Sequence, residues 1–587
     1  MIGRLSWGIL AMALLVLPAR AEPVEEMLKL VPDSALGLVA VNRPAEVDVK
    51  LQEIAKQLQM PAPSPLTLLK AVAGIREGLD EKGTVALLLL PQAGSAGPAP
   101  VVLAPVSDYD KFIAPLAPAD AKAAVTLIRI GGKPVLARRI GGFVAMSDER
   151  YRDALESLQA AAAVAKPLQP WQEWVAKNDV VLLAFRPGIE ILSARAQEGL
   201  KTVEATLDRV SGAKPELKEQ MQSAVAVFRV YGKAVRAVER NCESFGLALR
   251  RDAQGTIRVA TRTRMLADSR WGKSLVGAKR AGDPLAGLPD GPFLLAGGGP
   301  LPKDAMEAMM KFSIQMMKTM PGAFGVEDNQ IDEMFGELMK TMRSVRGMAM
   351  VLGVPEKDQS LYGNTVAVME VDDAKQFLAD YEKAMADYAR AMSKAKGPMV
   401  QQIEMKKIKV AGVDGLELVV KMPQLPAGSP PQAAKIMEMI VGKEGSLTAW
   451  IAPAGDKRIV FGYVHKANVE RAIAAIKQDA PGLSAAPEVK KAAAILPKDA
   501  VWVAYWSPRG TAEFINCVIP RLVPKAEDGD SRAIALPEFP QTPPLAFSIS
   551  TAPGEVQTEM IVPSEVVKAL GQYIPKLRAM RKPPSRN

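Results

Sequence analysis

The chain has 587 residues, of which 48% are hydrophobic and 24% charged, so it is long enough to bury several cores. Its formal net charge is +10, but the 74 Lys and Arg residues are dispersed among 64 acidic ones and do not alternate with aromatic residues, which disfavours nucleic-acid binding. One histidine and two cysteines leave little material for zinc sites or histidine-based catalysis, and no cofactor is predicted.

The first 21 residues have the pattern of a cleaved bacterial signal peptide. A basic start (1–4) precedes an apolar run (5–17), and small residues then lead up to Glu22. The apolar run is shorter than the roughly 20 residues that span a bilayer. We therefore predict cleavage between Ala21 and Glu22, a mature chain without a transmembrane segment, and a periplasmic or secreted location.

Three short blocks recur in the same order along the mature chain. A turn containing Leu-Pro-Asp or a close variant occurs at Leu30–Ala35, Gly287–Pro292 and Ile495–Ala500. Each of these turns precedes a short strand. The blocks Val106–Phe112 and Val371–Phe377 match without gaps, and in each a strand (101–103 or 365–369) leads into a Ser or Asp helix cap. A final strand and helix occur at Phe143–Leu158 and Phe461–Ile476, with matching apolar positions on the helix.

A smaller unit follows each larger one. In the first copy, the strand 179–185 precedes long helices over 188–210 and 216–240, and a hairpin then turns at 252–255. In the second copy, the strand 501–505 precedes a helix over 511–522 and a hairpin that turns at 552–554. A tandem duplication is the simplest explanation.

Short hairpins such as Ile130–Pro134 and Val413–Gly415 require antiparallel pairing. The predicted fold class is therefore α+β, built from tandem-duplicated units of antiparallel sheet with helices packed on one face. The predicted units are a signal peptide (1–21), a large unit (22–165), a small unit (170–280), a second large unit with a Met-rich helical insertion (286–480) and a second small unit with a basic tail (486–587).

This pattern resembles large exported bacterial proteins that are classed as domains of unknown function. The resemblance depends on the exported N-terminus, the Leu-x-Pro-Asp start and the strand that leads into a Ser or His cap. These motifs mark turns and helix starts, so the resemblance implies no activity and no site residues.

Methionine is concentrated between residues 306 and 350 and forms one stripe of a predicted helix. The stripe consists of Met306, Met309, Met310, Met316, Met317 and Met320, with Phe312 nearby. Three interpretations stay open: a packing face, an adaptable apolar groove for peptides or lipids, and a Cu(I) thioether site. The packing face is the ordinary one, because methionine is common in cores and no His or Cys accompanies the stripe.

Cys242 and Cys517 are the only thiols, one in each predicted small unit. In an oxidising compartment they could form a disulfide that joins the two halves, or they could be two buried free thiols. The only histidine, His465, aligns with Ser147 at a helix start and is expected to be a cap or surface residue.

The sequence favours an exported, non-enzymatic binding or interaction protein of the cell envelope. Its partner is undetermined, and an envelope protein, a peptide or a lipid is compatible with the pattern. Two alternatives are an envelope hydrolase that uses only carboxylates to act on glycans or peptides, and a structural envelope or matrix protein. A hydrolase of this kind needs two converging carboxyl groups, at least one with a raised pKa.

Overall fold

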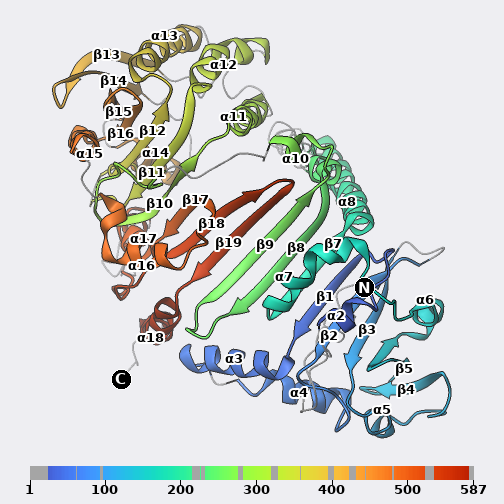
Figure 1. The fold of residues 1–587 in the computed structure, drawn as a ribbon. Coiled ribbons are helices and arrows are strands. Elements are labelled where there is room, and N and C mark those ends of the chain that lie inside the picture. Colours follow the sequence, from blue (N-terminus) through green and yellow to red (C-terminus); the bar gives the residue numbers. More distant parts are fainter. Residues whose placement is uncertain are drawn as a thin grey trace.

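The computed structural model describes residues 24–60, 62–92, 97–213, 225, 232–233, 235–274, 282–318, 328–356, 359–393, 402–421, 431–442, 445–478, 482–522 and 535–580. We call the described residues 24–274 the first half and 282–580 the second half. Figure 1 shows two lobes, at lower right and upper left, connected by a central group of strands. The predicted signal peptide, with Ala21 and Glu22, lies outside the described residues.

The strands of the first half are β1 (Gly37–Asn42), β2 (Thr84–Leu90), β3 (Ala99–Pro105), β4 (Val125–Ile130), β5 (Lys133–Ile140), β6 (Phe143–Ser147), β7 (Val180–Phe185), β8 (Cys242–Arg251) and β9 (Ile257–Met265). Its helices are α2 (Val24–Leu28), α3 (Pro44–Gln57), α4 (Pro65–Ala73), α5 (Tyr109–Ile113), α6 (Arg152–Ser157), α7 (Gln172–Lys177), α8 (Arg186–Ala213) and α10 (Arg270–Ser274), with 3₁₀ turns at Ala114–Leu116, Glu149–Tyr151 and Lys166–Trp171.

The strands of the second half are β10 (Phe293–Pro300), β11 (Val345–Gly353), β12 (Thr365–Val371), β13 (Gln402–Val410), β14 (Val413–Lys421), β15 (Ser446–Pro453), β16 (Arg458–Tyr463), β17 (Ala500–Trp506), β18 (Leu545–Ala552) and β19 (Glu555–Val562). Its helices are α11 (Lys303–Lys318), α12 (Asp328–Met342), α13 (Ala374–Met392), α14 (Pro431–Val441), α15 (Lys466–Lys477), α16 (Pro487–Ala494), α17 (Pro508–Leu522) and α18 (Ser564–Met580), with a 3₁₀ turn at Leu483–Ala485.

Several local predictions are confirmed. Asp108 accepts a hydrogen bond from the Lys111 N–H at the start of α5, and Asp373 caps α13 through the Gln376 N–H. The β4–β5 hairpin turns at two glycines with positive φ, as expected. The second predicted hairpin is displaced, because Val413 already begins β14. Its turn is formed by Ala411 and Gly412, whose φ angles are 48° and 77°.

All strands join one antiparallel sheet of 19 strands in the described residues. In the first half the order is β4-β5-β6-β3-β2-β1-β7-β8-β9, and in the second it is β13-β14-β15-β16-β12-β11-β10-β17-β18-β19. The halves meet where β9 pairs with β19, which we call the central junction. The strands of each predicted small unit thus extend the sheet of the preceding large unit. The unit boundaries and the duplication itself stay predictions.

Helices pack on both faces of the sheet, so the predicted one-sided packing is not confirmed. On β3, Leu103 belongs to a core with Leu155 of α6, whereas its neighbour Val102 belongs to a core with Phe112 of α5. Successive strand residues point to opposite faces, so these cores lie on opposite sides. The second half repeats this pattern, because Val368 of β12 shares a core with α15 and Met369 shares one with α13.

Near the central junction, one face of the sheet is apolar and partly exposed. A row of directly opposed residues crosses six strands from β7 to β17: Leu182, Leu247, Thr261, Thr558, Ile549 and Trp502. Leu182, Leu247 and Ile549 are 37–40% exposed. We call this surface the open face. On the opposite face the same strands carry buried residues such as Leu183 and Ala248.

Candidate functional site: an acid-lined cleft in the second half

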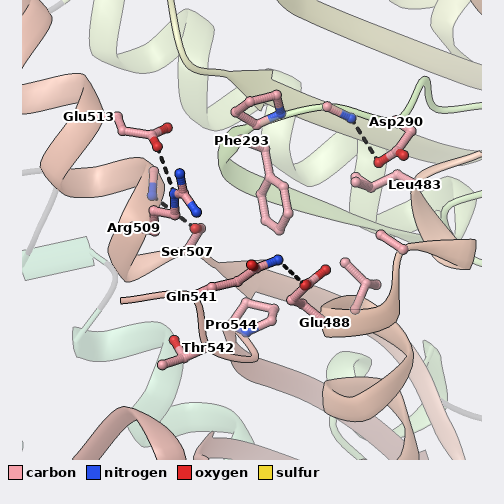
Figure 2. A pocket seen from close by; sticks show the side chains of 15 residues that line it. Asp290, Phe293, Leu483, Glu488, Ser507, Arg509, Glu513, Gln541, Thr542 and Pro544 are labelled. Carbon is pink, nitrogen blue, oxygen red and sulfur yellow. Dashed lines mark hydrogen bonds and ion pairs between the residues drawn. The ribbon is translucent and has the colours of Figure 1, made fainter. Parts of the chain in front are cut away.

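A cleft of about 340 Å³ lies where four segments of the second half converge. It is bounded by the Leu-Pro-Asp turn that precedes β10, the 3₁₀ turn with α16, the start of α17, and the segment 541–544. Figure 2 shows the Phe293 side chain in the middle of the cleft, with Arg509 on one side and Leu483 on the other. Leu483, Val489 and Pro544 add to its apolar lining.

The cleft carries more negative than positive charge. Its described lining residues include the carboxylates of Asp290, Glu488 and Glu513 against one guanidinium, that of Arg509. Arg509 pairs with Glu513 at 2.9 Å, and the Glu513 hydrogen bond holds the pKa of Arg509 above its usual value. Arg509 also pairs with Glu538 at 2.8 Å. This cation is therefore already neutralised by two carboxylates.

The other two carboxylates accept hydrogen bonds from neutral donors. Glu488 accepts from the amide of Gln541, and Asp290 accepts from the Gly291 N–H at 2.9 Å (Figure 2). The hydroxyl oxygen of Thr542, which also lines the cleft, is buried and has no hydrogen-bond partner within the described chain. The cleft thus combines an apolar floor with polar groups able to bind a ligand.

The structure does not bring the two cysteines together. Cys242 is buried at the start of β8, whereas Cys517 lies in α17 and its thiol contacts the Pro355 carbonyl oxygen at 3.2 Å. Both thiols are free. Burial raises the pKa of Cys242 to about 11, and burial likewise raises that of Cys517. The sequence left a disulfide or two buried free thiols as alternatives; both thiols are free here, but only Cys242 is buried and Cys517 is partly exposed.

The methionine stripe lies largely on α11. Met306 is buried in a core with Val345 and Phe377, and Met310 packs against that core, whereas Phe312 is 50% exposed. These positions fit the packing interpretation for the first turns of the helix. Met309, Met316 and Met317 lie on α11, but their side chains fall outside the description, as does Met320 altogether. The structure does not test the groove or the copper site there.

The histidine and carboxylate candidates are separate from the cleft. His465 occupies the N-cap position of α15, but its ring contacts the Gln359 side chain at 2.9 Å instead of capping the helix. Glu81, in the first half, lies 3.9 Å from Lys70, and burial raises its pKa to about 7. Among the described residues, no group of three or more His, Cys, Asp or Glu is arranged to hold a metal ion.

The sequence did not identify the cleft residues. In the sequence, Asp290 stands out only as part of a Leu-Pro-Asp turn, and Arg509 with Glu513 only as an ordinary i, i+4 pair on a helix. Glu488 and Gln541 are 53 residues apart and meet only after folding. No periodicity or motif indicates their convergence.

Comparison with known proteins gives no relative. No protein-family model, no curated protein and no solved structure matches the chain. None of the described helices has the length and apolar character needed to cross a membrane.

Proposed function

We propose that this protein is an exported, non-enzymatic binding protein of the bacterial envelope, and that its ligand binds in the acid-lined cleft. The cleft carries this proposal. Its volume of about 340 Å³ falls within the range of small-molecule sites, roughly 300–1,000 Å³, and a few polar groups converge on an apolar floor. Export is supported by the N-terminal sequence alone.

A cleft-filling variant tests the binding role. Gln541 is exposed at the cleft, so Gln541→Trp should fill the space without disturbing the core. We expect thermal-shift and calorimetric screens of peptides, amines, lipids and glycans to find ligands that bind the wild type and fail to bind this variant. If every ligand binds both proteins equally, the cleft is not the site.

One further measurement addresses export. Sequencing the N-terminus of the protein recovered from a bacterial envelope should give Glu22 as the first residue.

The proposed duplication is supported by the similar strand orders of the two halves and by two glycines. Gly188, at the start of α8, packs against the Leu36 carbonyl group just before β1. Gly510, at the start of α17, packs in the same way against the Phe293 carbonyl group at the start of β10.

The hydrolase alternative has less support. It requires a carboxyl group with a raised pKa beside a second one in a cleft. Among the described carboxyl groups, Glu81 has a pKa that burial and the neighbouring Asp80 both raise, but neither residue lines the acid-lined cleft.

The structural-protein alternative is favoured by the open face, because contiguous exposed apolar surface often marks association sites. It predicts that the purified protein self-associates and that Leu247→Lys makes it monomeric. Sedimentation of both proteins decides between these outcomes.

A further inference from the structure

The charge of the cleft selects among the chemical classes of ligand. Among the described residues that line the cleft, the one cation, Arg509, is already paired with Glu513 and Glu538. Within the described part of the chain, Glu488 and Asp290 accept hydrogen bonds only from neutral donors, and the charge of Glu488 also acts on Arg509 without a direct ion pair. A carboxylate gains more from a charged donor than from a neutral one, so a ligand cation would improve the pairing of both side chains.

The start of α17 offers little to an anion. A helix N-terminus binds anions through free N–H groups. Here the Gly510 N–H donates to the Ser507 hydroxyl at 2.9 Å, and the Thr511 N–H donates to the Ser507 carbonyl at 2.9 Å. An anionic ligand would displace these bonds and face an excess of carboxylates.

The apolar floor of the cleft adds a requirement on the ligand, which needs an apolar part as well as a charge. The floor is lined by Phe293, Leu483 and Val489, which are 9%, 1% and 2% exposed, so Phe293 is the most accessible of the three. An aromatic face attracts organic cations, and aliphatic surface accommodates the methylene stem of an alkylamine. A small hydrated metal ion would gain nothing from this floor.

We propose, as a refinement that rests on the binding role above, that the cleft binds an organic cation carried on a short apolar stem. Lys and Arg side chains of a peptide share this chemistry with free polyamines. Glu488 is the principal charged partner of the cation, and the ring of Phe293 contacts the stem.

Calorimetry with three probes of equal length tests the proposal on the full mature chain. The probes are hexylammonium, the neutral hexanol and the anionic hexanoate. We expect hexylammonium to bind at least about tenfold more tightly than the other two, because only this probe supplies a charged donor. The Glu488→Gln variant keeps the shape of the side chain and should reduce hexylammonium affinity by about tenfold without changing that for hexanol. A matched control is Glu46→Gln on α3, an exposed glutamate in the first half.

The outcomes separate the two proposals. If hexanol binds as tightly as hexylammonium, or if Glu488→Gln leaves hexylammonium affinity unchanged, the cation proposal is wrong while the binding role stands. If no ligand in the screen distinguishes the wild type from Gln541→Trp, the binding role itself is wrong. Parallel titrations with spermidine and with a capped lysine peptide then identify the source, which is the one that binds more tightly and loses affinity in Glu488→Gln.

Discussion

The hydroxyl oxygens of Thr261 and Thr558 lie 2.7 Å apart at the middle of the central junction. The two residues are directly opposed in the β9–β19 pair, although 297 positions separate them in the chain. On each side of this pair the row continues outward through an aliphatic residue, Leu247 or Ile549. The hydrogen-bonded pair therefore joins the two halves at the middle of the open face.

On the opposite face, Arg262 links the halves. It donates to the Pro170 carbonyl oxygen and to Glu555, each at 2.7 Å, and lies 5.2 Å from the Trp171 ring centroid. Because Arg262 and Glu555 are 18% and 13% exposed, Arg262→Met should lower the free energy of unfolding by about 3 kcal/mol by removing the cation that pairs with Glu555, which keeps its hydrogen bond from the Gln557 side chain. Urea unfolding measures this loss.

Two variants control this prediction. Adding Glu555→Gln to Arg262→Met should recover part of the loss, since no buried carboxylate is then left without its cation. In contrast, Arg152→Met removes the pair with Glu156, in which both side chains are about half exposed, and should change stability by about 0.5 kcal/mol or less. Equal losses in Arg262→Met and Arg152→Met would contradict the linking role.

The two faces of β7 differ in burial, and this difference gives a second prediction. Leu183 is 2% exposed and Leu182 is 40% exposed, although the two are adjacent. Leu183→Ala should cost about 2–5 kcal/mol, the usual range for a buried leucine, and Leu182→Ala about 1 kcal/mol or less. Thermal unfolding of the two variants measures the difference. The reverse order would mean that the register of β7 is shifted by one residue.

Two glycines of α8 make a matched pair. A Cβ at Gly188 would overlap the Leu36 carbonyl oxygen, which accepts the Phe185 N–H at 3.0 Å, whereas a Cβ at Gly199 would meet no atom within 4 Å. Gly188→Ala should therefore destabilise the protein by more than about 1 kcal/mol. Gly199→Ala should stabilise it by about 0.5–1 kcal/mol, because glycine is unfavourable inside a helix. If both variants stabilise the protein, the close approach of α8 to Leu36 is absent in solution.

Glu81 should make stability depend on pH. Burial raises its pKa to about 7 from an ordinary value of 4.5, so the folded protein retains a proton that the unfolded chain releases between these values. The resulting stabilisation, about 3 kcal/mol, is complete below pH 4.5 and is lost as the pH rises through 7. Glu81→Gln should remove this dependence. A difference between wild type and variant that is constant across this range would contradict the assignment, and Glu46→Gln is the exposed control.

The thiols give a fifth prediction. Because both are free, the protein purified without reductant should react with two equivalents of a thiol reagent in denaturant. Under native conditions Cys242 should react only as fast as the protein unfolds, since its thiol is buried and its raised pKa, about 11, suppresses the thiolate. The Cys517→Ala variant isolates this slow phase. A protein without free thiols would instead contain a disulfide.

The local elements of this fold follow from patterns within short stretches of the chain. Apolar alternation, glycine-containing turns and aspartate caps depend on residues close together in the chain, so the strands, the Asp108 and Asp373 caps and the antiparallel class could be predicted. Where the prediction was displaced, at Ala411 and Gly412, the alternative turn lay within two residues and satisfied the same preference for positive φ.

The tertiary structure alone decided how these elements meet. Pairing of β9 with β19 depends on contacts between residues about 300 positions apart, and no local pattern distinguishes a sheet edge from a junction. The same holds for the packing of helices on both faces and for the cleft, where Asp290, Glu488 and Arg509 come from three segments. Charges that converge from distant segments leave no periodic trace in the chain, because only folding brings them within reach of one another.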